Sequence, residues 1–142
     1  MRARNVKALQ YVLHSKGYKV AIDGYFGAQT QKYVRQFQQA RKLHMTGVVE
    51  AYTWETLVPL LHRGSQGDAV RAIQILLNWQ FKDWNPESVE RKPGQIRVDG
   101  TYGKVTEKSV RTFQEAISVI QVNGKTDYGT WCCLLGGHLD GE

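Results

Sequence analysis

Apolar residues recur at helical spacing near the start of the chain. They are Val6, Leu9, Val12 and Leu13, three or four positions apart or adjacent on one helical face. Asn5 is expected to cap this helix at its N-terminus, and Gly17 to end it. The pattern therefore predicts an amphipathic helix over the first fifteen or so residues, with one face in a core.

Two more helices are predicted in the first half of the chain. Thr30 is expected to cap a helix that buries Val34 and Phe37. Thr53 is expected to begin a third helix, which runs through Trp54, Leu57, Leu60 and Leu61. Glycine-containing turns separate these segments, and the pattern is typical of three short helices around one core.

The same pattern then occurs a second time. A second apolar stripe follows Asp68, which is expected to cap its helix, and Thr106 and Thr130 take the places of Thr30 and Thr53. The shared residues are Gln10, Asp23-Gly24, Phe26-Gly27, Thr30, Phe37-Gln38, Gly47 and Thr53-Trp54, matched by Gln74, Asp99-Gly100, Tyr102-Gly103, Thr106, Phe113-Gln114, Gly124 and Thr130-Trp131. The offset is 64 at the first helix, 76 at the Asp-Gly turn and 77 from Gly47 onward, so one long insertion and one extra residue separate the copies.

The repeat predicts an all-α fold of two tandem three-helix-bundle modules joined by a short Gly-rich linker. We expect module 1 at residues 1–62 and module 2 at 63–142, with an insertion near 79–94. The linker begins with Arg63 and is five residues long, so the modules are expected to be close neighbours.

The charge of the chain is unevenly divided. The formal net charge is +6, and residues 1–62 hold nine Lys and Arg against three Asp and Glu, whereas 63–142 hold ten of each. A basic module favours an anionic polymer: nucleic acid, teichoic acid or carboxylate-rich cell wall. Nucleic acid is the weakest of these, because the basic residues build no recognition helix or groove-binding motif.

The residue pattern argues against catalysis and against a cofactor or metal. The four histidines have no counterparts between the copies and no metal-binding spacing. Asp23 and Asp99 are the only acidic residues that are identical in both copies, and their place before glycine favours an Asx turn. The shared glutamines are expected to brace the Asp-Gly loop. Cys132 and Cys133 are adjacent, which favours burial as small hydrophobic groups over a disulfide or a soft-metal site.

No membrane span or signal peptide is expected from the hydropathy of the chain. It contains no run of 18 apolar residues, and Met1 to Arg4 lead directly into helical pattern.

These motifs resemble the peptidoglycan-binding domain family found beside the catalytic domains of bacterial and phage cell-wall hydrolases. The match in the first copy is carried by Leu9-Gln10, Gly17-Tyr18, the run from Asp23 to Thr30, Phe37-Gln38, Gly47 and Thr53-Trp54-Glu55-Thr56-Leu57. The second copy lacks the Gly-Tyr and has Tyr102 in place of Phe. The resemblance implies a three-helix bundle that binds cell-wall peptidoglycan and catalyses no reaction.

Peptidoglycan offers sugar rings, carboxylates and an amine, so its site calls for exposed aromatic, basic and amide groups. The residues expected around the Asp-Gly loops are Tyr18, Asp23, Tyr25, Phe26, Gln29, Arg35 and Tyr52 in module 1, and Trp84, Asp99, Thr101, Tyr102, Lys104, Arg111 and Tyr128 in module 2. Two alternatives stay open. Phe26 and Tyr102 line the floor of the groove or pack in the core. In the insertion, either Trp79 and Phe81 extend the core beside a solvated, charged loop, or Trp84 is exposed and stacks on a sugar ring or seals a groove.

The function expected is non-catalytic binding of peptidoglycan, which targets an associated hydrolase or wall-penetrating machine to the wall. This places the chain outside the cell or in the cell wall. The alternative is a structural module that docks onto a partner protein, as an inhibitory pro-segment does, without binding the wall.

Overall fold

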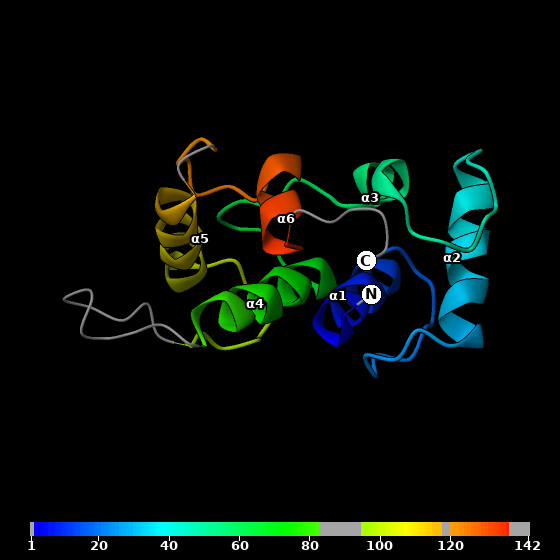
Figure 1. The fold of residues 1–142 in the computed structure, drawn as a ribbon. Helices are drawn as coiled ribbons and strands as arrows, with labels where there is room; N and C mark the ends of the chain where they lie inside the picture. The colour runs from blue at the N-terminus through cyan, green and yellow to red at the C-terminus, as the bar shows by residue number, and fades with distance from the viewer. Residues whose placement is uncertain (1, 83–94, 118–119, 137–142) are drawn as a thin grey trace.

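The computed structural model describes residues 2–82, 95–117 and 120–136, which form six helices and no strand (Figure 1). The helices are α1 (Ala3–Ser15), α2 (Ala28–Ala40), α3 (Ala51–Leu57), α4 (Asp68–Phe81), α5 (Lys104–Ala116) and α6 (Tyr128–Leu134). The expected all-α fold of two helical triplets is therefore confirmed. Trp84 and most of the insertion near 79–94 lie outside the described residues.

Helices α1 and α4 pack against each other at the centre of the molecule, and α2 and α5 stand at opposite ends (Figure 1). A single cluster of buried apolar side chains runs from Ala8 in α1 to Leu135 after α6. It includes the repeated tryptophans Trp54 and Trp131, which are 1% and 0% exposed. The two triplets thus share one hydrophobic core, which offsets the limited burial available to a unit of about 60 residues.

The linker is held against the second triplet by backbone hydrogen bonds. Gly64 N donates to Tyr102 O at 2.9 Å, Tyr102 N donates to Ser65 O at 2.9 Å, and Gly67 N donates to Gly100 O at 2.8 Å. Just before the linker, the carbonyl oxygen of Pro59 accepts a hydrogen bond from Trp131 Nε1 of the second triplet at 2.8 Å. These bonds fix the path between the triplets, so the close packing expected from a short linker is present.

The start of α1 differs from the sequence prediction. The helix begins at Ala3, and Asn5 lies inside it, 3% exposed, with its amide donating to Leu135 O at 3.1 Å. Asn5 therefore ties α1 to the end of the second triplet and is no N-cap. The predicted end at Gly17 is confirmed: Gly17 has φ 96°, and Tyr18 N donates to Leu13 O at 3.2 Å.

Thr30 and Thr106 are not the N-caps that were expected, and Thr53 and Thr130 do not begin their helices, for one shared reason. Thr30, Thr53, Thr106 and Thr130 are each the third residue of their helix. Their hydroxyl groups face a buried glutamine, so they are not available to cap a backbone N–H. Asp68 is the first residue of α4 and likewise no cap; its carboxylate pairs with Arg71.

Four buried glutamines brace four turns in the same way. Gln10 Oε1 accepts from the N–H groups of Asp23 and Gly24 at 3.0 and 2.9 Å. Its Nε2 donates to Asp23 Oδ1, Tyr25 O and Thr30 Oγ1 at 2.9 to 3.0 Å. One side chain therefore joins α1, the Asp-Gly turn and the first turn of α2.

The brace recurs at Gln74, which bonds Asp99, Gly100, Thr101 and Thr106. The predicted bracing of the Asp-Gly loops is therefore confirmed for Gln10 and Gln74. Gln38 and Gln114 brace a different turn, the one between the second and third helices. Gln38 bonds Thr46, Gly47, Val48 and Thr53, and Gln114 bonds Asn123, Gly124, Lys125 and Thr130.

We predict that Gln10→Ala destabilises the fold by about 3 kcal/mol, because it leaves two backbone N–H groups and a threonine hydroxyl without their partner. Gln36→Ala, which removes an exposed amide from α2, is the matched control and is expected to change stability by less than about 0.5 kcal/mol. Urea unfolding followed by circular dichroism measures both. Equal midpoints for the two variants would contradict the bracing role.

Candidate functional site

The Asp-Gly turns are held rigidly beside the second helix of each triplet. Asp23 Oδ1 accepts from Gln10 Nε2 and from Tyr25 N, both at 2.9 Å. Asp99 Oδ1 accepts from Gln74 Nε2 at 3.1 Å and from Thr101 N at 2.9 Å. The backbone N–H bond, followed by the glutamine bond, lowers the pKa of each carboxyl group. Both aspartates therefore form the expected Asx turn.

An open groove lies next to the first of these turns. This groove, here groove 1, has a volume of about 480 Å³ and is lined by His14, Gly17, Tyr18, Lys19, Val20, Ala21 and Gln29. The Tyr18 ring packs at 5.9 Å from Tyr33 and edge-on at 6.5 Å from Phe37, centroid to centroid. Gln29 Oε1 accepts from Ala21 N at 2.9 Å. Groove 1 therefore has one fixed aromatic wall and one fixed amide.

A second groove lies at the corresponding place in the second triplet. Groove 2 has a volume of about 290 Å³ and is lined by Ile96, Arg97, Asp99, Thr101, Gly103, Lys104, Val105 and Thr106. With the offset of 76, three of these positions match Val20, Ala21 and Gln29 of groove 1. Each groove is thus formed by the segment before an Asp-Gly turn and the start of the helix that follows it.

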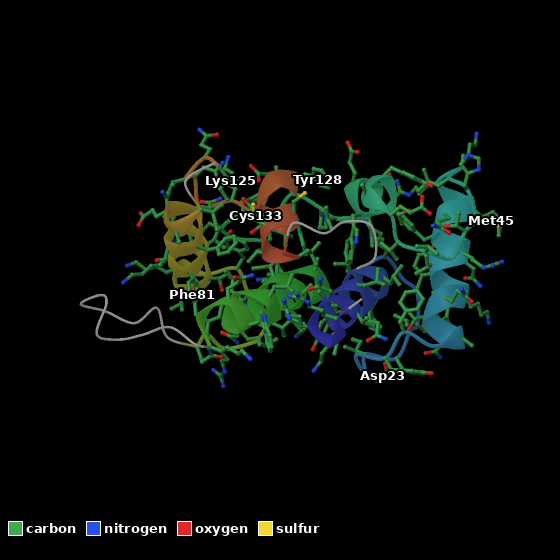
Figure 2. All side chains as sticks on the ribbon, viewed as in Figure 1. Asp23, Met45, Phe81, Lys125, Tyr128 and Cys133 are labelled. Atoms are coloured by element: carbon green, nitrogen blue, oxygen red, sulfur yellow. The ribbon has the colours of Figure 1, made fainter. Side chains whose placement is uncertain are left out.

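The structure gathers part of the predicted site at these grooves. Tyr18 and Gln29 line groove 1, and Asp99, Thr101 and Lys104 line groove 2. Asp23 and Tyr25 lie on the adjoining turn, which Figure 2 shows at the edge of the molecule. The Tyr25 side chain is 72% exposed, and its ring covers Gly27, where a Cβ atom would lie 2.5 Å from it. Phe26 is half-buried against the core.

Tyr102 does not line a groove, so its place among the expected ligand-binding residues is corrected. It is 1% exposed, and its hydroxyl group donates to Gly124 O at 2.6 Å. Burial raises the pKa of Tyr102 to about 12. The ring is a core residue that links the two braced turns of the second triplet.

Four other predicted residues lie away from the Asp-Gly turns, contrary to expectation. Arg35 and Arg111 pass over Gly47 and Gly124, where Cβ atoms would lie 3.0 and 2.9 Å from their Nε atoms. Tyr128 is the first residue of α6 (Figure 2), and its hydroxyl group donates to Ala51 O in α3 at 3.3 Å. Burial, followed by a hydrogen bond with Cys132, raises its pKa to about 12. Tyr52 is 38% exposed on α3.

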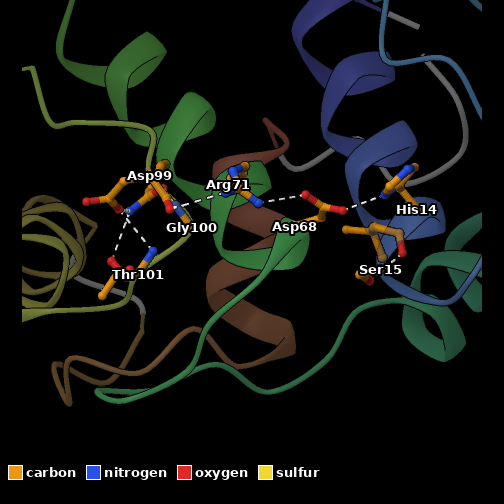
Figure 3. Close-up of polar contacts among 9 residues, drawn as sticks. His14, Ser15, Asp68, Arg71, Asp99, Gly100 and Thr101 are labelled. Carbon is orange, nitrogen blue, oxygen red and sulfur yellow. Dashed lines mark hydrogen bonds and ion pairs between the residues drawn. The ribbon is translucent and has the colours of Figure 1, made fainter.

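A polar chain crosses from groove 1 to groove 2 (Figure 3). His14 Nδ1 lies 2.5 Å from Asp68 Oδ2, and Arg71 Nη1 donates to Asp68 Oδ1 at 2.8 Å. Arg71 Nη2 in turn donates to Asp99 O at 3.4 Å. His14, Lys19 and Arg97 were not among the predicted site residues, because the prediction rested on residues shared between the copies. They could have been identified from the sequence by comparing the charge of matched positions in the two copies, where each faces an uncharged residue.

The structure offers little for metal or thiol chemistry in its described part. No group of three or more His, Cys, Asp or Glu gathers there. Cys132 and Cys133 are half-buried, and burial raises the pKa of both thiols. No helix among residues 2–82, 95–117 and 120–136 is long and apolar enough to cross a membrane.

The two triplets correspond to the two segments matched by one protein family. The model of the family described as "Putative peptidoglycan binding domain" matches residues 2–57 and 66–134. The chain belongs to this family. Each matched segment of the peptidoglycan-binding family contains two glutamine braces, one Asp-Gly turn and one groove. Comparison with curated proteins and with solved structures gave no match.

We predict that Asp23→Asn makes the fold less sensitive to acid. The folded-state pKa of Asp23 is lowered, so its stabilising contribution is present above the unfolded pKa of about 4 and is lost as pH falls through the folded value. An asparagine keeps the turn, because Asn123 Oδ1 accepts the same two bonds in the fourth brace.

The measurement is urea unfolding at several pH values between about 6 and 3, which spans the titration of aspartate. Asp23→Asn should be less stable than wild type at the upper end and lose less stability on acidification. Glu115→Gln, which removes an exposed carboxylate from α5, should follow wild type. Parallel pH curves for wild type and Asp23→Asn would exclude this role of Asp23.

Proposed function

We propose that this protein binds cell-wall peptidoglycan without catalysing a reaction on it, and that it holds an associated hydrolase or wall-penetrating machine at the wall. The observation that carries the proposal is the pair of open grooves at corresponding places in the two segments matched by the peptidoglycan-binding family. Two such sites on one chain gain avidity against a repetitive polymer. The proposal places the protein at the cell wall, outside the cytoplasmic membrane.

The groups around groove 1 suit such a polymer. Tyr25 is exposed and Tyr18 is held by two neighbouring rings, so both can offer apolar faces to sugar rings. Gln29 and Lys19 offer hydrogen bonds to hydroxyl and carboxylate groups. The turn between these residues is fixed by Gln10, so little ordering is required on binding.

Arg35 and Tyr52 form a separate candidate contact. Arg35 lies in the second half of α2, over Gly47, and Tyr52 lies on α3, so both are away from the Asp-Gly turn. We propose that groove 1, together with Tyr25, is the principal binding site. A polymer that extends past this groove would then reach Arg35 and Tyr52.

A second candidate function is docking onto a partner protein without wall binding, as a pro-segment does. It is favoured by the exposed apolar side chains Met45, Val48 and Leu60, which are 45%, 47% and 59% exposed. This alternative would be supported if the chain formed a stoichiometric complex with a separate hydrolase and did not bind peptidoglycan.

We predict that Tyr25→Ala weakens binding to purified, nuclease-treated peptidoglycan about tenfold, because it removes the most exposed aromatic face beside groove 1. The measurement is co-sedimentation over a range of protein concentrations, with folding checked by circular dichroism. Arg35→Ala is the comparison variant and is expected to have a smaller effect. Undiminished binding by Tyr25→Ala, together with loss of binding by Arg35→Ala, would place the site at the Gly47 turn between α2 and α3 instead.

A further inference from the structure

The two grooves carry basic residues at positions that do not correspond. Groove 1 has His14 and Lys19, and the matched positions in the second triplet are Asn78 and Gln95. Groove 2 has Arg97 and Lys104, and the matched positions in the first triplet are Ala21 and Ala28. Both grooves therefore hold two basic side chains, although the walls that supply them differ.

This difference bears on the ligand. If the basic residues served only the fold, matched positions would be expected to have similar roles in the two triplets. The shared feature is instead the presence of two basic side chains beside each Asp-Gly turn. A groove with such groups favours an anionic ligand, and carboxylate is bound well by paired N–H donors.

Position 14 shows how the triplets diverge. In the second triplet, the Asn78 side chain bonds both backbone groups of Ile96. Its Nδ2 donates to Ile96 O at 2.9 Å, and its Oδ1 accepts from Ile96 N at 2.7 Å. His14 makes no such bond to the matched segment. Its Nδ1 lies 2.5 Å from Asp68 Oδ2 in α4, so the second triplet fixes a wall of groove 1.

The chemistry of that contact sets what His14 can offer. An ionised carboxylate only accepts, so Nδ1 carries the proton that it shares with Asp68. Nε2 then donates to a ligand when the ring is protonated. Arg71 balances the charge of Asp68 at 2.8 Å, so the three groups together carry one positive charge when His14 is protonated. The charged groups that face His14 are Asp68 and Arg71 on α4, and Lys19 across the groove.

We propose that groove 1 binds a carboxylate of the peptidoglycan stem peptide through Lys19 and His14, with Asp68 of the second triplet as the positioning residue for His14. The inference rests on the proposed function and narrows it to one part of the polymer. It also makes the tandem arrangement necessary for a complete groove 1, because the partner of His14 comes from α4.

The test is isothermal titration of the full chain with a soluble disaccharide–peptide fragment, prepared with its stem-peptide carboxyl groups either free or amidated. Wild type should bind the free form about tenfold more tightly. The double variant His14→Asn/Lys19→Gln, which copies the second triplet, should lose most of this preference. Lys7→Gln, which removes an exposed cation from α1, is the charge-matched control and should retain it.

Asp68→Asn separates positioning from simple charge. The variant keeps His14 and Lys19 but removes the carboxylate that holds Nδ1 of His14. Its preference for the free carboxylate should fall below that of wild type, whereas simple loss of a negative charge would raise it, and the proton spectrum of the His14 ring should change. An unchanged or stronger preference would contradict the positioning role of Asp68. Folding of each variant is checked by circular dichroism.

Three outcomes would overturn the inference while leaving peptidoglycan binding intact. The first is equal affinity for the free and amidated fragments, and the second is an undiminished preference in the double variant. The third is binding to teichoic acid, or to glycan chains that carry no stem peptides, in place of the free fragment. A wild-type protein that binds neither fragment nor intact peptidoglycan would instead contradict the proposed function.

Discussion

Hydrogen bonds from buried glutamine amides hold the turns and the helix starts of both triplets in place. Gln10, Gln38, Gln74 and Gln114 are each 0% exposed, and each joins a helix, the glycine turn that follows and the third residue of the next helix. Glutamine suits this position because its amide both donates and accepts. Asparagine is one methylene shorter, and glutamate has no N–H to donate to the carbonyl and hydroxyl groups around it. A buried amide is stabilising only when its bonds are made, and here they are made.

The braces account for the position of the grooves. Short helices of seven residues, such as α3 and α6, have little stability of their own and depend on packing. The braces fix the turn that precedes each of them and the turn that precedes α2 and α5. The groove walls therefore stand on turns whose backbone N–H groups bond to the core. The packing of α1 against α4, together with the His14–Asp68–Arg71 chain, sets one groove relative to the other.

Much of this arrangement was predictable from the sequence because its key residues occur twice. The helical triplets follow from apolar spacing, and the role of Gln10 and Gln74 follows from an amide placed beside a core and an Asp-Gly turn. The threonine caps were wrong because a local rule assigned Thr30 and Thr106 to the backbone, whereas a glutamine twenty or more residues away binds their hydroxyl groups. For the same reason, Gln38 and Gln114 were predicted to brace the Asp-Gly turn, whereas they brace the turn before the third helix. Which turn a glutamine reaches depends on how the chain is folded around it.

The candidate site was less predictable than the fold. An aromatic residue after an Asp-Gly turn can face solvent or the core: Tyr25 is exposed, whereas Tyr102, one position further along in the matched turn, is buried. Spacing in the sequence did not show that Arg35 and Arg111 lie over the other turn. His14 escaped notice because its significance depends on Asp68, which is 54 residues away and in the other triplet.

In the proposed mode of binding, braced turns present two grooves to the cell-wall polymer. The most direct measurement is a map of backbone amide shifts in an NMR titration with soluble peptidoglycan fragments. We expect shifts concentrated at residues 17–21 and 29 and at 96–97 and 103–106, while the side-chain amide signals of the four glutamines stay in place. Shifts confined to α3 and α6, or displacement of the glutamine signals on binding, would contradict it.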